Sequence, residues 1–237
     1  MKTELHKAGS RGHANHGWLN SYHSFSFGGY HHPDRMHFGA LRVLNDDTVA
    51  AGMGFGKHPH DNMEIVSIPL SGDLQHQDST GRNEIIRAHD VQIMSAGSGI
   101  AHSEMNASKT EEVKFLQIWV FPKLKNIAPR YEQKSFLPEN RLNQILTVVA
   151  PDDANAVFIN QDAWFSLGHF SKDLSIEYSI KKTGNGVYVF VLSGSVTVNG
   201  TTLENRDGLG VSETDVLSIV ANTESELLLI DIPMDLV

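Results

Sequence analysis

The chain of 237 residues contains no cysteine. This absence excludes disulfide bonds, cysteine-ligated zinc, iron–sulfur clusters and a thiol nucleophile. Basic residues are scarce, since 19 Lys and Arg stand against 28 Asp and Glu, and no basic run is longer than a pair. The net charge of −9 argues against direct contact with nucleic acid. No apolar run approaches the ~20 residues of a membrane helix, and no signal-peptide pattern is present, so we expect a cytoplasmic protein without membrane association.

Sustained helical periodicity is also lacking. The apolar stretches are short and are bounded by Gly, Asn, Asp and Pro, as at 22–27, 38–44 and 187–192. Such segments are typical of β-strands, and many of them in series favour a sandwich, jelly roll or barrel. We predict an all-β fold with only short helices, near 138–145 and 152–156.

A weak internal repeat divides the chain. Leu-Ser-Gly at 70–72 recurs at 192–194, and each half closes with an apolar strand that runs into a proline, Pro122 or Pro233. The intervening segment 123–143 is polar and contains further prolines, which indicates a linker. We predict a first domain at 1–135 and a second at 136–237.

Histidine is abundant and unevenly placed, because twelve of the 13 lie within the first 102 residues. His58 and His60 alternate on a predicted strand, so their side chains share one face. A His-x-His pair alone is expected about 0.7 times by composition, but with Gly52 ahead of it and Glu64 behind it the expectation falls to about 0.003. The extended pattern is therefore informative.

A second segment has the same character. Gly97 and Gly99 permit a tight turn, after which His102 and Glu104 alternate on one strand face. With His58 and His60 they offer three imidazoles and a carboxylate, a donor set close to that of non-heme iron enzymes. We expect one divalent transition metal, with Fe(II) favoured and Mn, Ni, Cu or Zn as alternatives.

These motifs resemble those of the cupin superfamily. Gly52, His58, His60 and Glu64 match its first motif, and His102 and Asn106 match the end of its second. Further segments make the chain similar to the pirin family, and in particular to its bacterial members assigned quercetin 2,3-dioxygenase activity. They include Gly54-Phe-Gly-Lys-His-Pro-His60, Met94-Ser-Ala-Gly97, His102-Ser-Glu104, Gln117-Ile-Trp119 and the segments 11–13, 16–19, 23–28 and 38–47.

The resemblance implies a bicupin, two β-barrel domains of which the first holds one metal through His58, His60, His102 and Glu104. In most other cupins the carboxylate at the position of Glu64 is a ligand. Here Glu64 is expected either to be an alternative ligand, to support the ligands from outside, or to act as a base in the pocket.

The second half cannot repeat this site. Alignment of the two Leu-Ser-Gly segments places Ile180 and Lys182 at the positions of His58 and His60, and no histidine follows His169. We expect the second domain to pack on the first and to shape its pocket.

The leading functional hypothesis is a dioxygenase that opens the heterocycle of a flavonol-like aromatic with O2. Glu104 or Glu64 would take the proton of the substrate 3-hydroxyl. The alternative, which the resemblance also implies, is a metal-binding regulatory or interaction protein that works through a protein partner. A cupin isomerase acting on sugar phosphates is a weaker third possibility, because few Lys or Arg residues are near the motifs.

The remaining polar residues receive plain structural predictions. His13, His16 and His23 are expected to make backbone hydrogen bonds, and 31–34 and Asp46-Asp47 to form turns. His76 and Asp78 are assigned to a solvated strand face. Gln117 has two equal interpretations, a buried hydrogen-bond partner or a side chain that faces the pocket.

Overall fold

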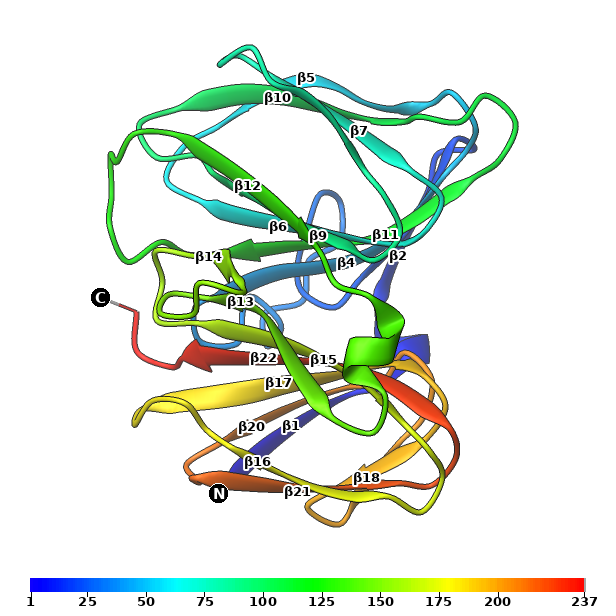
Figure 1. Ribbon diagram of the computed structural model, residues 1–237, viewed down its shortest axis with the longest axis vertical. Coiled ribbons are helices and arrows are strands. Elements are labelled where there is room, and N and C mark those ends of the chain that lie inside the picture. The colour runs from blue at the N-terminus through cyan, green and yellow to red at the C-terminus, as the bar shows by residue number, and fades with distance from the viewer. Residues whose placement is uncertain (237) are drawn as a thin grey trace.

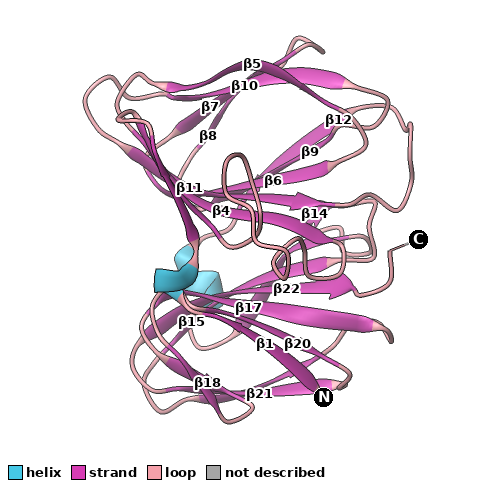
Figure 2. Ribbon diagram, turned by 180° about the vertical axis from the view of Figure 1, so that it is seen from behind, coloured by secondary structure: helices cyan, strands magenta, loops and turns pink. Residues whose placement is uncertain are grey.

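Two β-barrels make up the protein in the computed structural model, which describes residues 1–236 (Figure 1). Each barrel consists of a seven-stranded and a four-stranded sheet. Within residues 1–236, helix is limited to two single 3₁₀ turns, η1 (Ala8–Ser10) and η2 (Pro138–Arg141), and Figure 2 shows strands joined by loops in the rest. The predicted all-β bicupin architecture is confirmed.

The first barrel occupies the upper half of Figure 1. Its large sheet has the order β12-β9-β6-β11-β4-β3-β2, formed by β2 (Gly12–Asn15), β3 (Leu19–His23), β4 (Leu41–Val49), β6 (Glu64–Ser71), β9 (Asp90–Ser95), β11 (Val113–Val120) and β12 (Arg130–Ser135). Its small sheet has the order β5-β10-β7-β8, formed by β5 (Gly54–His60), β7 (Leu74–Asp78), β8 (Asn83–Ile86) and β10 (Ile100–Asn106).

The second barrel repeats this plan. Its large sheet has the order β1-β20-β17-β22-β15-β13-β14, formed by β1 (Lys2–His6), β13 (Ile145–Ala150), β14 (Val157–Phe158), β15 (Trp164–Phe170), β17 (Asn185–Ser193), β20 (Gly208–Ser212) and β22 (Ser225–Pro233). Its small sheet has the order β16-β21-β18-β19, formed by β16 (Ser175–Ser179), β18 (Val196–Val198), β19 (Thr201–Leu203) and β21 (Val216–Ala221).

The chain passes from the first large sheet to the second between Ser135 and Ile145. Strand β1 is an exception to this division of the chain, because it precedes the first barrel in sequence but pairs antiparallel with β20 of the second barrel. The residues of β1, which the sequence analysis assigned to the first domain, thus belong to the second large sheet. His6 at the end of β1 is buried there, with its Nδ1 2.9 Å from the hydroxyl of Tyr188.

Three local predictions were wrong. Segment 123–143 is not a simple linker, since it contains β12, which pairs with β9. Residues 152–156 form a turn rather than a helix, closed by the Ala156 amide, which donates to the Asp153 carbonyl at 3.1 Å. Asp46 and Asp47 lie inside β4 and not in a turn.

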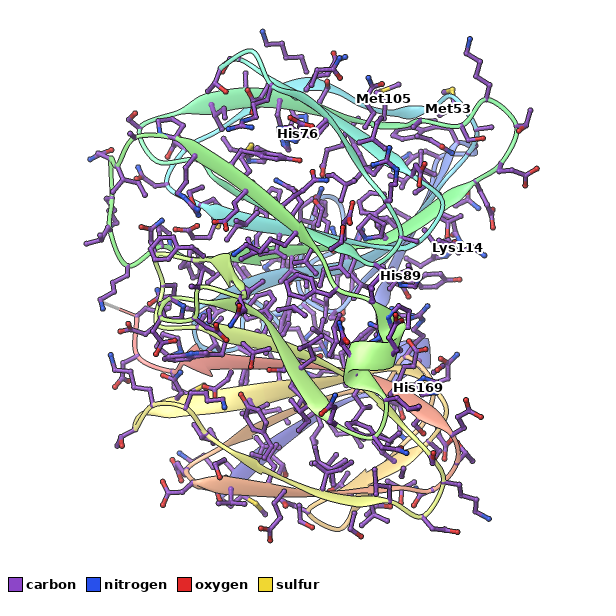
Figure 3. The ribbon with its side chains drawn as sticks, viewed as in Figure 1. Met53, His76, His89, Met105, Lys114 and His169 are labelled. Atoms are coloured by element: carbon purple, nitrogen blue, oxygen red, sulfur yellow. The ribbon has the colours of Figure 1, made fainter. Side chains whose placement is uncertain are left out.

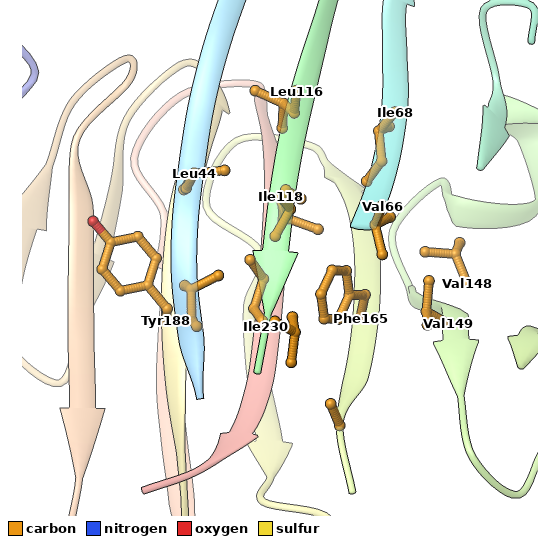
Figure 4. Packing of buried hydrophobic residues seen from close by; sticks show 14 of the residues in the cluster. Leu44, Val66, Ile68, Leu116, Ile118, Val148, Val149, Phe165, Tyr188 and Ile230 are labelled. Atoms are coloured by element: carbon orange, nitrogen blue, oxygen red, sulfur yellow. The ribbon is translucent and has the colours of Figure 1, made fainter. Parts of the chain in front are cut away.

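The largest hydrophobic cluster lies between the two large sheets. Leu44, Val66 and Ile118 from the first sheet meet Phe165 and Ile230 from the second (Figure 4). Each such side chain that is removed from water stabilises the fold by about 1.5–3 kcal/mol. The outer face of the first sheet is therefore committed to packing, which leaves its inner face for the site. No helix in residues 1–236 has the length and hydropathy to cross a membrane.

Candidate metal centre

Three histidines meet at one end of the first barrel. Antiparallel pairing of β10 with β5 sets His102 opposite His58 and Ile100 opposite His60. Residues on one strand alternate between faces, so His58 and His60 both lean toward His102. The ring centroids are 4.5 to 4.9 Å apart, and one nitrogen of each ring can be chosen so that all three lie within 4.8 Å of one another. Within residues 1–236 no second group of three His, Cys, Asp or Glu side chains comes so close.

The protonation states of these rings suit a metal. Burial lowers the pKa of His60 to about 4, and burial with the neighbouring imidazoles lowers the pKa of His102 still further, so both are neutral near pH 7. The Nδ1 of His58 lies 2.8 Å from the Gly56 carbonyl, which can only accept, so Nδ1 carries the hydrogen and Nε2 is free to act as a ligand. Neutral imidazole is the form that coordinates first-row transition metals.

His102 shows most clearly whether the three histidines suit a metal ion. Its side chain is almost completely buried, yet neither ring nitrogen has a hydrogen-bond partner among the described residues. A buried polar group in a native protein almost always has a partner. A divalent metal bound between the three rings would satisfy one of these nitrogens, so the residues present fit such an ion.

Glu104 follows His102 on β10 but has other partners. A bulge between the two residues shifts the register, so that Glu104 lies opposite Phe55. Its carboxylate is fully buried and accepts hydrogen bonds from Ser67, at 2.9 Å, and from the amide of Gln117. Burial raises the pKa of Glu104, while these two donors favour its charged form. Gln117 also lines the cavity described below, so both interpretations of its polar side chain apply.

Glu64 lies at the junction of the two barrels. Its carboxylate accepts from Ser95 at 2.6 Å and from the side-chain amide of Asn160 at 2.9 Å, and Asn160 belongs to the second barrel. Burial raises its pKa. Neither carboxylate belongs to the group of three histidines, but Glu104, unlike Glu64, lines the same cavity as His58 and His60.

His76 and Asp78 are not on a solvated face as predicted. Both side chains are buried, with His76 Nε2 3.0 Å from Asp78 Oδ2. The His76 ring packs against His102, with ring centroids 5.3 Å apart, and Figure 3 places it inside the upper barrel. The small sheet therefore supports the histidine cluster with the further buried imidazole of His76.

His58 and His60 line a cavity of about 280 Å³ inside the first barrel. Apolar side chains line part of the wall, among them Leu19, Phe27, Phe55 and Trp119. The polar part of the wall was missed by the sequence analysis: Ser21, His23, Asn45 and Asp47. The alternation of residues along β3 could have revealed this polar wall, because every second residue of the strand is buried, at Leu19, Ser21 and His23.

Comparison with known proteins agrees with this site. The pirin family model matches residues 4–120, and a model described as the quercetinase C-terminal cupin domain matches residues 147–232. A protein of Escherichia coli strain K12 named quercetin 2,3-dioxygenase is 44% identical over 229 residues, which cover 97% of this chain and 98% of the relative. A pirin-like protein of Caulobacter vibrioides is 40% identical and covers 93% of this chain and 95% of its own length.

A solved structure is equally similar. The crystal structure of the bacterial pirin YhhW from Escherichia coli in complex with nickel(II) matches with a TM-score of 0.93 and 43% identity, covering 98% of this chain and 99% of that one. The motifs, the two barrels and the histidine cluster thus lead to one conclusion: the chain belongs to the pirin family of bicupin proteins.

Proposed function

We propose that the protein is a metal-dependent dioxygenase of the quercetin 2,3-dioxygenase type, which cleaves a flavonol-like aromatic with O2. The observation that carries the proposal is a cluster of three imidazoles, two of which line one cavity together with a buried carboxylate. The name of the Escherichia coli relative, at 44% identity over nearly the full chain, supports the same activity.

His58, His60 and His102 would hold one divalent metal, and we propose Glu104 as the fourth ligand and Fe(II) as the ion. A bound metal of this kind supplies a Lewis acid and a template that brings two reactants together. The relative crystallised with nickel(II) supports a site for a first-row divalent ion. Among such ions, the donor set of imidazole and carboxylate is shared by iron, manganese, nickel and copper sites.

The chain's own residues would supply the general base and the walls of the substrate cavity. Glu104 is the better placed of the two candidate bases, because Glu64 lies at the barrel junction and does not line the cavity. Burial raises the pKa of Glu104, so its ionised carboxylate is a stronger base for a phenolic proton of the substrate. The apolar wall excludes water from the reacting atoms.

Trp119 gives the cavity a further aromatic wall beside the histidines. Its ring packs edge-on against His60, with centroids 4.9 Å apart. We propose that this ring packs against an aromatic substrate bound in the cavity and so helps to orient it.

The test uses untagged protein loaded with Fe(II) and checked by elemental analysis. Loss of quercetin absorbance is followed together with oxygen uptake, and a His58→Ala, His102→Ala double variant is compared with His13→Ala, a histidine outside the cluster. We expect turnover in the wild type and in His13→Ala, and none above free metal in the double variant. Full turnover in the double variant would refute the proposal. One metal per chain without any oxygen uptake would instead fit a metal-binding regulatory protein.

A further inference from the structure

A second cavity lies between the two barrels and shares no lining residue with the cavity at the metal centre. Its volume is about 280 Å³, close to the lower end of the range for small-ligand sites, about 300–1,000 Å³. The two Leu-Ser-Gly segments of the internal repeat meet here, since Leu70 and Leu192 both line the wall. We call this space the inter-barrel cavity.

Equivalent turns of the two barrels each bring a basic side chain to this cavity. His89 and Arg206 both line it, and both have a left-handed backbone, with φ of 75° and 66°. Each precedes a buried aspartate, Asp90 or Asp207, whose carboxylate accepts the backbone N–H of the residue three positions earlier, at 2.8 and 2.9 Å. Figure 3 places His89 beside the η2 turn, which adds the guanidinium of Arg141 to the wall. The duplicated fold thus gathers three basic side chains in one cavity.

Arg141 is enclosed but poorly paired. Its side chain is only 11% exposed, and its one ion contact among residues 1–236, between Nη2 and Glu226, is 3.6 Å long, too long for a hydrogen bond. Nε is buried without a partner and is out of reach of a ligand as well. Nη1 and Nη2 are not enclosed in this way, so these are the groups that can donate to a molecule in the cavity. Because an enclosed arginine normally has a close partner, its position favours an added acceptor.

Arg206 also carries charge that its partner does not fully balance. Its Nε lies 3.3 Å from Asp46 Oδ2, but the same oxygen accepts a hydrogen bond from Arg11 at 3.1 Å. Two guanidinium groups thus share one carboxylate. Nη1 of Arg206 is enclosed without a partner, which leaves Nη2 as the group that can meet a ligand.

Two carboxylates limit the charge that a ligand can carry. Asp90 and Glu226 line the same cavity as Arg141 and Arg206, so the charges of these four side chains sum to zero. Both carboxylates would repel a dianion such as hydrogen phosphate more strongly than a monoanion. The planar guanidinium group matches a carboxylate through paired hydrogen bonds, so a carboxylate is the monoanion that two arginines hold best.

We propose that the inter-barrel cavity binds a small monocarboxylate with an apolar body. Arg141 and Arg206 donate to the carboxylate, and the body packs against the apolar part of the wall, which consists of Ile68, Leu70, Leu167 and Leu192. The site goes beyond the proposed dioxygenase function and does not depend on it, because the two cavities share no residue.

The test measures binding of 4-fluorobenzoate to the metal-loaded full chain by ¹⁹F NMR titration without oxygen. The comparison ligand 4-fluorobenzyl alcohol is similar in size but uncharged. Acetate, which lacks the apolar body, and inorganic phosphate are added as competitors. A carboxylate can also bind a metal, so the titration is repeated with the His58→Ala, His102→Ala double variant.

The variants at the cavity are Arg141→Gln and Arg206→Gly, since glycine suits the left-handed backbone at position 206. Arg82→Gln is the matched control, because Arg82 is exposed, lies 3.8 Å from Glu84 and lines neither cavity. Near-UV circular dichroism verifies folding, and if one arginine variant fails to fold the other decides.

We expect 4-fluorobenzoate to bind at least tenfold more tightly than the alcohol, acetate or phosphate. Each arginine variant should weaken its binding by about tenfold or more, since a hydrogen bond to a charged group contributes about ten- to a hundredfold. Arg82→Gln and the histidine double variant should bind it as the wild type does.

Four results would overturn the proposal. Equal affinity for the acid and the alcohol, or unchanged affinity in both arginine variants, would show that the guanidinium groups do not hold the ligand. Loss of binding in the folded histidine double variant would place the carboxylate on the metal instead. Phosphate that binds as tightly as 4-fluorobenzoate would contradict selection for a monocarboxylate.

Discussion

Gln117 is the residue whose replacement reports most directly on the metal centre. Its amide donates to the fully buried carboxylate of Glu104, which has Ser67 as its second donor, at 2.9 Å. A hydrogen bond to a charged group contributes about 1.5–3 kcal/mol. Gln117→Leu should therefore raise the pKa of Glu104. The equilibrium constant for protonation of this carboxyl should rise by about ten- to a hundredfold.

The sign of the effect on metal affinity follows from this shift. Burial already raises the pKa of Glu104, so at low pH a metal must displace a proton from the carboxyl. In the variant this displacement costs more, and at pH values below the raised pKa the affinity should fall by about ten- to a hundredfold. At pH values above the raised pKa the carboxyl is ionised with or without metal, so the loss should shrink there.

The assay is competition with a chelator, which gives the dissociation constant for Fe(II) or Ni(II) under anaerobic conditions at pH 6 and pH 9. Ser67→Ala should act in the same direction, because it removes the other donor. Gln77→Leu is the matched control, since Gln77 is exposed on β7 and its side chain donates a hydrogen bond to Asn83, away from the cavity. The reasoning is refuted if the affinity is unchanged at pH 6, or if it falls equally at both pH values, which would indicate a packing effect instead.

Three further predictions concern backbone, core and pH. Gly54→Ala should abolish stoichiometric metal binding, because a Cβ at Gly54 would lie 2.3 Å from the Glu104 carbonyl oxygen and force β5 away from β10. Gly56→Ala is the control and should keep the metal in elemental analysis, because a Cβ at Gly56 meets open space. Phe165→Ala should lower the free energy of unfolding by about 3–5 kcal/mol in denaturant titrations, because Phe165 is fully buried between the barrels; a loss below about 1 kcal/mol would contradict that packing. Burial lowers the pKa of His6 from 6.5 to about 4, so the unfolded chain binds the proton more tightly and stability should fall as pH drops from about 6.5 to 4; His6→Gln should reduce this slope in pH-dependent thermal unfolding.

The sequence predicted the histidine cluster better than its surroundings. His58, His60 and His102 could be found because alternation on a strand and the glycine turns are local patterns, and pairing of β5 with β10 then brings the three together. The partners of Glu104 could not be found in this way. Ser67 and Gln117 are 37 and 13 residues away in the chain, and only the order of strands in the sheet makes them neighbours.

The need for tertiary contacts also explains why some polar residues were predicted in turns or on the surface but are buried in strands. Asp47 and Asp78 look like turn or surface residues because carboxylates are rarely buried. In the structure each has a buried partner, Ser21 for Asp47 and His76 for Asp78. Strand β1 is a further case, since nothing within residues 2–6 indicates that they pair with β20 at the far end of the chain. Such pairings depend on tertiary contacts that composition and periodicity do not encode.

The second barrel has a structural role that does not depend on metal ligands. The inner face of the first large sheet carries polar side chains such as Asn45 and Gln117, so the first barrel lacks a continuous hydrophobic core of its own, and its small apolar clusters lie apart. Its outer face is apolar and is packed against the second barrel. Because every second residue of a strand faces the other side, the sheet can be polar toward the cavity and still be stabilised from behind. The hydrogen bond from Asn160 to Glu64 adds a polar contact across the same junction. The second barrel thus stabilises a sheet whose inner face is polar, in a fold where, among residues 1–236, only the first barrel brings three histidines together.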